Sequence, residues 1–298
     1  MRKERFNMKL SNIIIFTLIM VLTSSIALAA SPVKKPVLYF NPLETRQAKG
    51  DNAWKNAGTA GGEISKGEAK PVLEMGPLEI PSIGLKADDA AWYTATRSKT
   101  VFANEAEDRK APVLNLESFT IGLLMRVNGP YFAEENIVIG IQTEGKIPPR
   151  AHEQVVRIWL DVQGKGIVQN VSIAQNVIQA RHDFSNRRNK LKLGENEWHW
   201  IHIVFESGVS VTTYLDGTEA ASHPTEVKWD PAHDLNLHGI FTSNFEVQQR
   251  TCNCSIAIYR VYDRPLNADE VSKNVRNSLS VDPAGKLAVT WGKMKRGF

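Results

Sequence analysis

The segment from Glu195 to Gly217 constrains the fold most strongly, because it carries two apolar runs on either side of a break. From Trp198 to Phe205, large apolar residues alternate with polar or smaller ones. A β-branched and aromatic run from Val209 to Leu215 follows the break and ends at Asp216–Gly217. Alternation with a period of two is typical of a strand that buries one face. The segment therefore predicts an antiparallel β-hairpin with one buried face.

Short apolar runs separated by turns occupy much of the remaining chain. They predict strands over residues 37–42, 92–94, 119–127, 137–143, 155–161, 167–174, 177–180 and 255–262. One helix is predicted over residues 268–278, with Asn267 as its N-cap and Glu270 placed to complete a capping box. Many short strands and one helix predict an all-β fold, an antiparallel two-sheet sandwich with a short C-terminal helix.

Two segments resemble the laminin G-like domains of the concanavalin A-like lectin/glucanase superfamily. In the hairpin the matching residues are Trp198, His199, Phe205, Tyr214, Asp216 and Gly217. In residues 255–271 they are Arg260, Tyr262, Asp263, Arg264, Leu266 and Glu270. The run from Phe119 to Val127 is similar to a further strand of the family, so the resemblance extends over residues 36–280. It implies a jelly-roll sandwich, in a superfamily that includes lectins, adhesion modules, glycosidases and lyases.

The first 29 residues have the three parts of a secretory signal peptide: a basic start, an apolar core from Ile13 to Leu22, and a small-x-small site at Ala27–Ala29. We therefore expect a secreted, cell-surface or periplasmic protein. The expected organisation is a signal peptide at 1–29, a linker at 30–36, a laminin G-like sandwich at 37–280 and a tail at 281–298. No later apolar run reaches the ~20 residues that span a bilayer, so we expect no membrane span after cleavage.

Charge gives no indication of the partner. The leader holds four basic residues and one acid, so a net charge of +1 remains from the +4 of the whole chain. Nucleic-acid binding calls for a much more basic domain and is not expected.

The main difference from the hydrolases of the superfamily is that the sequence lacks their catalytic acids. These enzymes carry their paired acids in an E-x-D-x-E run, which the sequence lacks. The acids at Glu195–Glu197 and Glu105–Asp108 lie in predicted loops, and we interpret them as solvated. His152, Gln154 and Arg157 match part of a lyase constellation. The sequence favours a non-catalytic module, with a polysaccharide-degrading enzyme or a structural cell-surface or matrix subunit as alternatives.

The candidate binding residues are basic and aromatic. Arg181, Arg187, Arg188 and Lys190 lie in a predicted inter-strand loop, and guanidinium groups bind sulfate and carboxylate well. The alternative is a solvated loop. Two tryptophans, Trp159 and Trp229, are candidates for stacking on sugar rings. These residues predict a polysaccharide or glycan partner, with anionic glycans favoured by the basic loop, or else an extracellular protein.

Calcium is the one cofactor that the resemblance suggests, because many relatives hold it near the first and last strands. Asn41 is the candidate ligand, but Ala257 and Ile258 stand where the family often has two acids. The sequence leaves a calcium-bound and a calcium-free protein open. No other cofactor is expected.

Three smaller features complete the predictions. Cys252 and Cys254 are the two cysteines, and a local disulfide between them needs a turn or bulge; two buried thiols are the alternative. His199 is interpreted as a hydrogen-bonded strand residue rather than a metal ligand. In the tail, Leu287, Val289 and Trp291 alternate with smaller residues, which predicts an edge strand.

Overall fold

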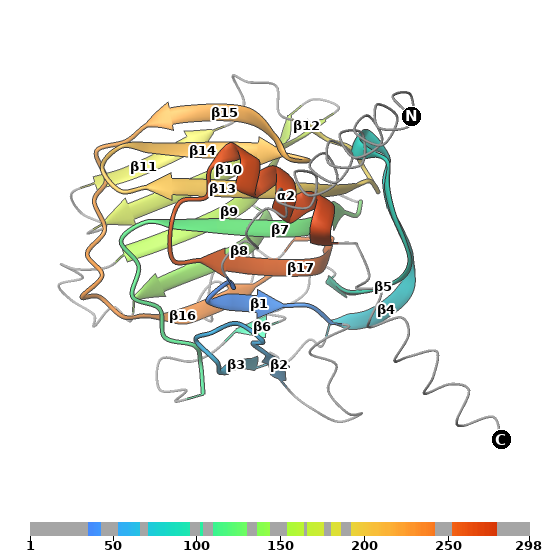
Figure 1. Cartoon of the computed structure of the whole chain (residues 1–298), viewed down its shortest axis with the longest axis horizontal. Coiled ribbons are helices and arrows are strands. Elements are labelled where there is room, and N and C mark those ends of the chain that lie inside the picture. Colours follow the sequence, from blue (N-terminus) through green and yellow to red (C-terminus); the bar gives the residue numbers. More distant parts are fainter. Residues whose placement is uncertain are drawn as a thin grey trace, which may run out of the picture. The chain divides into compact units, whose positions relative to one another are not determined.

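The computed structural model describes residues 35–42, 53–65, 71–95, 102–103, 110–129, 136–143, 154–163, 166–175, 180–185, 192–241 and 252–278. These residues form two large antiparallel sheets and a two-stranded one, β2 (Ala53–Lys55) with β3 (Glu63–Ser65). Figure 1 shows the two large sheets as stacked layers. The predicted all-β, two-sheet fold is confirmed.

The eight-stranded sheet has the order β15-β14-β13-β7-β17-β5-β4, with β1 beside β17. Its strands are β1 (Leu38–Phe40), β4 (Val72–Ile80), β5 (Leu85–Ala95), β7 (Phe119–Val127), β13 (Trp198–Glu206), β14 (Ser210–Leu215), β15 (Thr218–Pro224) and β17 (Cys254–Tyr262). The predicted strands at 119–127, 198–205, 209–215 and 255–262 therefore all lie in this sheet.

The seven-stranded sheet has the order β11-β10-β9-β8-β16-β6, with β12 beside β10. Its strands are β6 (Phe102–Ala103), β8 (Asn136–Thr143), β9 (Gln154–Gln163), β10 (Gly166–Gln175), β11 (Ala180–Ser185), β12 (Lys192–Leu193) and β16 (Leu235–Ile240). The predicted strands at 137–143, 155–161 and 167–174 belong here and extend slightly further than expected.

The main core lies between the two sheets. The eight-stranded sheet contributes residues such as Ile121, Ile203 and Tyr259, and the seven-stranded sheet contributes residues such as Ile158 and Val171. All of these side chains are at most 1% exposed. Interdigitating apolar side chains from two facing sheets are what holds a β-sandwich together.

The eight-stranded sheet is also buried on its outer face, which corrects the prediction that the hairpin buries one face. Every residue from Trp198 to Phe205 is buried. On the outer face, Trp198 and Trp200 belong to a second apolar cluster with Leu78 and Ile80 of β4 and with Val275 of a helix. The β4–β5 hairpin and this helix therefore cover a face that sequence alternation alone would leave in water (Figure 1).

His202 lies in this covered region, and its surroundings show that water is excluded there. Its ring stacks on Trp200, with 5.2 Å between the ring centroids, and its Nε2 lies 3.4 Å from the side-chain amide nitrogen of Asn274. Burial, assisted by the nearby positive charge of Arg260, lowers the pKa of His202 to about 3. The imidazole is therefore neutral at pH 7.

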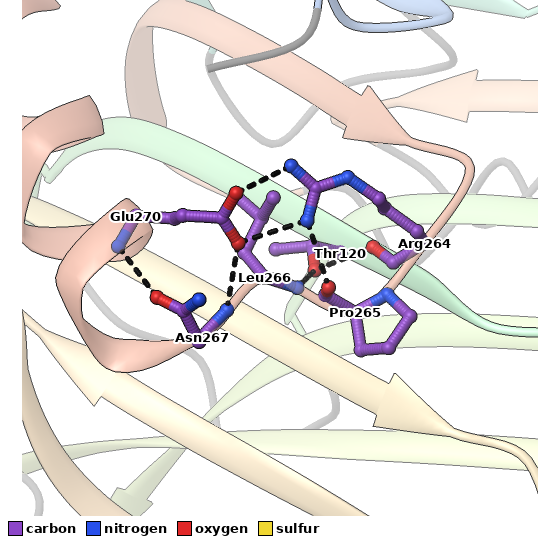
Figure 2. Close-up of polar contacts among 6 residues, drawn as sticks. All are labelled: Thr120, Arg264, Pro265, Leu266, Asn267 and Glu270. Carbon is purple, nitrogen blue, oxygen red and sulfur yellow. Dashed lines mark hydrogen bonds and ion pairs between the residues drawn. The ribbon is translucent and has the colours of Figure 1, made fainter. Parts of the chain in front are cut away.

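The helix is α2 (Ala268–Ser278), with the predicted bounds. The predicted capping box is confirmed: the backbone N–H of Glu270 donates to Asn267 Oδ1 over 3.0 Å, and the N–H of Asn267 donates to Glu270 Oε2 over 3.1 Å (Figure 2). Arg264 donates to both oxygens of Glu270, over 2.8 and 2.5 Å. None of the helices in the described part of the chain is long and apolar enough to cross a membrane.

We predict that Asn267→Ala lowers the free energy of unfolding by about 1 kcal/mol, because the backbone N–H of Glu270 loses its acceptor, Asn267 Oδ1. Asn267→Asp keeps an accepting oxygen at the N-cap and should remain close to wild type. Urea unfolding measures both variants. Equal losses for the two would show that the cap contributes nothing specific.

Candidate functional site

Strand β9 carries a candidate binding face at the centre of the seven-stranded sheet. Val156, Ile158 and Leu160 are buried in the main core. Arg157 and Trp159 alternate with them and are partly exposed. Because successive side chains of a strand point to opposite faces, Arg157 and Trp159 lie on the face directed away from the core, with their Cα atoms roughly 7 Å apart.

Gln142 on β8 borders the same face. It pairs with Val155, while Gly140, which has no side chain, pairs with Arg157. The Gln142 side chain is 4% exposed, yet its Oε1 accepts no hydrogen bond within the described part of the chain. A buried carbonyl oxygen without a donor costs about 1–3 kcal/mol. This oxygen therefore has unused acceptor capacity among the described residues, although it is itself buried.

Polar residues continue at the paired positions of the next two strands. On β10, Ser172 pairs with Arg157 and Asn170 pairs with Trp159. On β11, Asp183 pairs with Ser172. The sheet thus places polar residue types at successive positions on the β10 side of Arg157 and Trp159, whereas Gly140 and Ile137 pair with these two residues on the β8 side.

The predicted basic loop begins as a strand. Arg181 lies in β11 and pairs with Ala174 of β10, so the prediction that it lies in a loop is wrong. The free edge of β10 supplies a backbone partner that the sequence does not reveal. Arg187, Arg188 and Lys190 lie outside the described residues, and their role in glycan binding stays a prediction.

The prediction of Trp229 as an exposed platform is corrected by its burial. Its side chain is 4% exposed. Its ring packs against Phe119 and Phe205, at centroid distances of 4.9 and 5.6 Å. The backbone N–H of Trp229 donates to Ser207 Oγ over 2.9 Å, which holds the segment against the β13–β14 turn. Trp229 fills the core, whereas Trp159 stays accessible.

A second polar cluster joins the start of β13 to the β14–β15 turn. His199 Nδ1 lies 3.0 Å from Asp216 Oδ2, and Ser82 Oγ donates to the same oxygen over 2.5 Å. The backbone N–H of Trp200 donates to Asp216 Oδ1 over 2.8 Å. These contacts confirm His199 as a hydrogen-bonded strand residue.

This cluster does not have the order of a nucleophilic triad. A serine nucleophile needs a hydrogen bond to the histidine that takes its proton, whereas Ser82 is bonded to the carboxylate. Asp216 and Gly217 have φ values of 51° and 85°, as the primed two-residue hairpin turns require. The cluster therefore fixes a turn. Burial alone would raise the pKa of Asp216, but the hydrogen bonds from His199, Ser82 and the Trp200 N–H outweigh it, so this pKa lies below its ordinary value.

The acidic candidates give no catalytic pair within the described residues. Glu195 and Glu197 are exposed, which confirms their interpretation as solvated acids. Gln154 and Arg157, which match part of a lyase constellation, have odd spacing and point to opposite faces of β9, so they do not share a site. Gln154 is fully buried, and its Nε2 donates to the backbone oxygen of Asp230 over 3.1 Å. Residues 105–108 and 152 lie outside the described part of the chain.

No cluster of three or more His, Cys, Asp or Glu side chains that could hold a metal ion occurs among the described residues. Asn41 is 8% exposed, and its Nδ2 donates to Tyr39 Oη over 3.0 Å. Calcium at Asn41 stays a prediction.

Cys252 and Cys254 form a disulfide in the structure, with their Cα atoms 5.5 Å apart. That separation falls within the usual range for disulfides. Both side chains are fully buried at the start of β17.

The sequence model of the concanavalin A-like lectin/glucanases superfamily matches residues 109–272. The chain belongs to this superfamily. The match covers β7 to the first turn of α2 and so includes the candidate face and, from the second polar cluster, His199, Trp200 and Asp216 but not Ser82. No curated protein matches the chain.

Solved structures with a similar fold include binding domains of bacterial toxins. The receptor-binding domain of botulinum neurotoxin type G is 12% identical, with a TM-score of 0.48 and an alignment that covers 82% of this chain and 52% of that one. The binding domain of Paraclostridial mosquitocidal protein 1 is 13% identical, with a TM-score of 0.46 and coverage of 82% and 52%. This member of the superfamily thus aligns with about half the length of either structure.

We predict that Asp216→Asn lowers the free energy of unfolding at pH 7 by about 2 kcal/mol, since hydrogen bonds to a charged acceptor contribute about 1.5–3 kcal/mol. Asparagine tolerates the positive φ, so the substitution separates charge from backbone strain. Because the pKa of Asp216 is lowered on folding, its contribution is complete above about pH 4 and is lost as the pH falls further. Denaturant titrations at pH 7 and pH 3 should show the difference between variant and wild type shrinking. An undiminished difference at pH 3 would contradict the role of the charge.

Proposed function

We propose that the protein is an exported, non-catalytic module that binds a carbohydrate on the outer face of the seven-stranded sheet. The observation that carries this proposal is that Arg157 and Trp159 of β9 lie next to each other, partly exposed, on that face. The Oε1 of Gln142, which has no partner among the described residues, lies beside them. The proposal of export rests on the leader-like composition of residues 1–29.

A sugar fits the chemistry of this face better than an apolar ligand does. An indole ring offers a flat apolar surface with a negative face, which suits the C–H groups of a pyranose. An amide oxygen accepts a hydroxyl proton, and a guanidinium donates in a fork that matches carboxylate or sulfate groups. Trp159, Gln142 and Arg157 supply these three groups in neighbouring positions. We therefore favour a polysaccharide with acidic groups.

Binding without cleavage is supported by the side chains described on this face, Gln142, Val155, Arg157 and Trp159, none of which is a carboxylate. Aspartates also stand at positions 161 and 183 of the same face, but two strand spacings and four residue positions put their Cα atoms roughly 16 Å apart. Glycoside hydrolysis uses two carboxyl groups about 5 to 9.5 Å apart. An indole, a guanidinium and an amide orient a chain but supply no acid and base pair for its cleavage.

Titration calorimetry of the mature chain with acidic and neutral polysaccharides, with the products analysed for cleavage, tests the proposal. We predict that Trp159→Ala weakens binding about tenfold, which corresponds to about 1.4 kcal/mol. Arg157→Ala should weaken binding of acidic polysaccharides more than of neutral ones.

Val209→Ala is the matched control, because Val209 is 54% exposed in the turn between β13 and β14 of the other sheet. This variant should bind like wild type. Detection of cleavage products would show that the protein is an enzyme and would contradict the proposed non-catalytic module. Unchanged binding in both face variants would place the ligand elsewhere, and an absence of binding to every polysaccharide would reject the proposed function.

A further inference from the structure

The terminal strand β4 exposes an unusual amount of apolar surface. Val72, Leu73 and Met75 are 60%, 40% and 51% exposed, and they are three of the five exposed large apolar residues in the described part of the chain. Among the described strands, β4 is the last of its sheet. Proteins usually protect such an edge with charges, with proline or with a covering segment. Pro77 stands further along β4, beyond this apolar stretch.

The β4–β5 hairpin that includes this stretch has a net negative charge, with four acids, Glu74, Glu79, Asp88 and Asp89, and one base, Lys86. Within the stretch, Glu74 accepts a hydrogen bond of 2.7 Å from Trp92 Nε1 and lies 3.9 Å from Arg126 Nη2. The other three acids lie at or beyond Pro77, where Glu79 is paired with Lys86. A segment that covers the edge should therefore be apolar with a net positive charge.

The tail of the chain has this composition. Leu287, Val289 and Trp291 alternate with Ala288 and Thr290, as in a strand with one apolar face. Residues 281–298 contain four basic residues and a single acid. The alternating run has five residues, the same length as the β4 stretch from Val72 to Gly76 that precedes Pro77.

The end of α2 leaves the tail within reach of β4. Ser278 Oγ accepts a hydrogen bond of 3.2 Å from Arg260 on β17. Tyr93 of β5 pairs with both Ile256 of β17 and Leu73 of β4. Three strand spacings, from β17 across β5 and β4 to the added strand, and four residues along β17 give a gap of roughly 20 Å. The eight residues 279–286 extend to at most about 26 Å, so the connection is long enough.

We propose that residues 287–291 add a strand to β4 of the same chain and cover its apolar edge. This inference is independent of the carbohydrate proposal, since it concerns the other sheet. The tail would then be part of the folded module, and its basic residues would lie beside the acids of the β4–β5 hairpin.

Hydrogen exchange of the full chain, followed by mass spectrometry, tests the strand. We predict that Val289→Asp/Trp291→Asp raises the exchange rate of the backbone amides in residues 72–76 at least tenfold, because the covering strand is lost. Thr290→Asp is the matched control, since its side chain lies on the opposite face of the added strand, and it should change the rate less than twofold.

The reciprocal variant Leu73→Asp/Met75→Asp, whose two side chains share one face of β4, should accelerate exchange of residues 287–291. Circular dichroism checks that each variant keeps its sheets. Unchanged exchange at residues 72–76 in the double variant would overturn the proposal. Protection of residues 72–76 that rises with protein concentration would also overturn it, because the occupant would then be the tail of a second copy.

Discussion

The burial of both faces of the eight-stranded sheet is the constraint on which the rest of this structure depends. One face meets the seven-stranded sheet in the main core, and the other carries a tryptophan-rich cluster that would be unstable in water. The β4–β5 hairpin and α2 are the described elements that cover it. Between these two layers this sheet has little room for a ligand. The site that we propose lies instead on the outer face of the seven-stranded sheet, where Arg157 and Trp159 are partly exposed.

The covering elements are attached by polar contacts at specific residues. Thr120 Oγ1 accepts the N–H of Leu266 over 2.8 Å and donates to the backbone oxygen of Arg264 over 3.0 Å, which ties the segment before α2 to β7 (Figure 2). At the other end, Ser82 in the hairpin connection donates to Asp216. Each contact joins residues more than 100 positions apart in the chain. Since each satisfies a buried polar side chain of the eight-stranded sheet or its turns, it sets the position of the cover as well as adding stability.

The parts of the fold that the sequence predicts are those whose structure is decided locally. The capping box of Asn267 and Glu270 and the Asp216–Gly217 turn depend on residue types at short spacings, so both are recognisable. Strand β4 is not predicted, because Gly76 and Pro77 indicate a turn and only pairing with β5 makes the segment a strand. The burial of Trp229 and the strand conformation of Arg181 depend on partners distant in the sequence, which local patterns do not contain.

The candidate site was only partly predictable for the same reason. Alternation along β9 places Trp159 and Arg157 on one face, so these two residues are accessible to sequence reasoning. The position of Gln142 depends on the register between β8 and β9, which shifts between Ile137 and Ile139. No sequence pattern indicates that shift, and a displacement by one residue would turn the amide to the opposite face of the sheet.

Recognition of the family and recognition of a ligand rest on different residues in this protein. The matching residues from Trp198 to Gly217 and from Arg260 to Glu270 lie in the eight-stranded sheet, its turns and the start of α2. Their contacts build and close the sandwich: His199 holds Asp216, and Arg264 holds Glu270. None of them lies on the outer face of the seven-stranded sheet. A chain can therefore keep every matching residue while the residues at positions 142, 157 and 159 change, so the proposed site on β8 and β9 can vary independently of the family match.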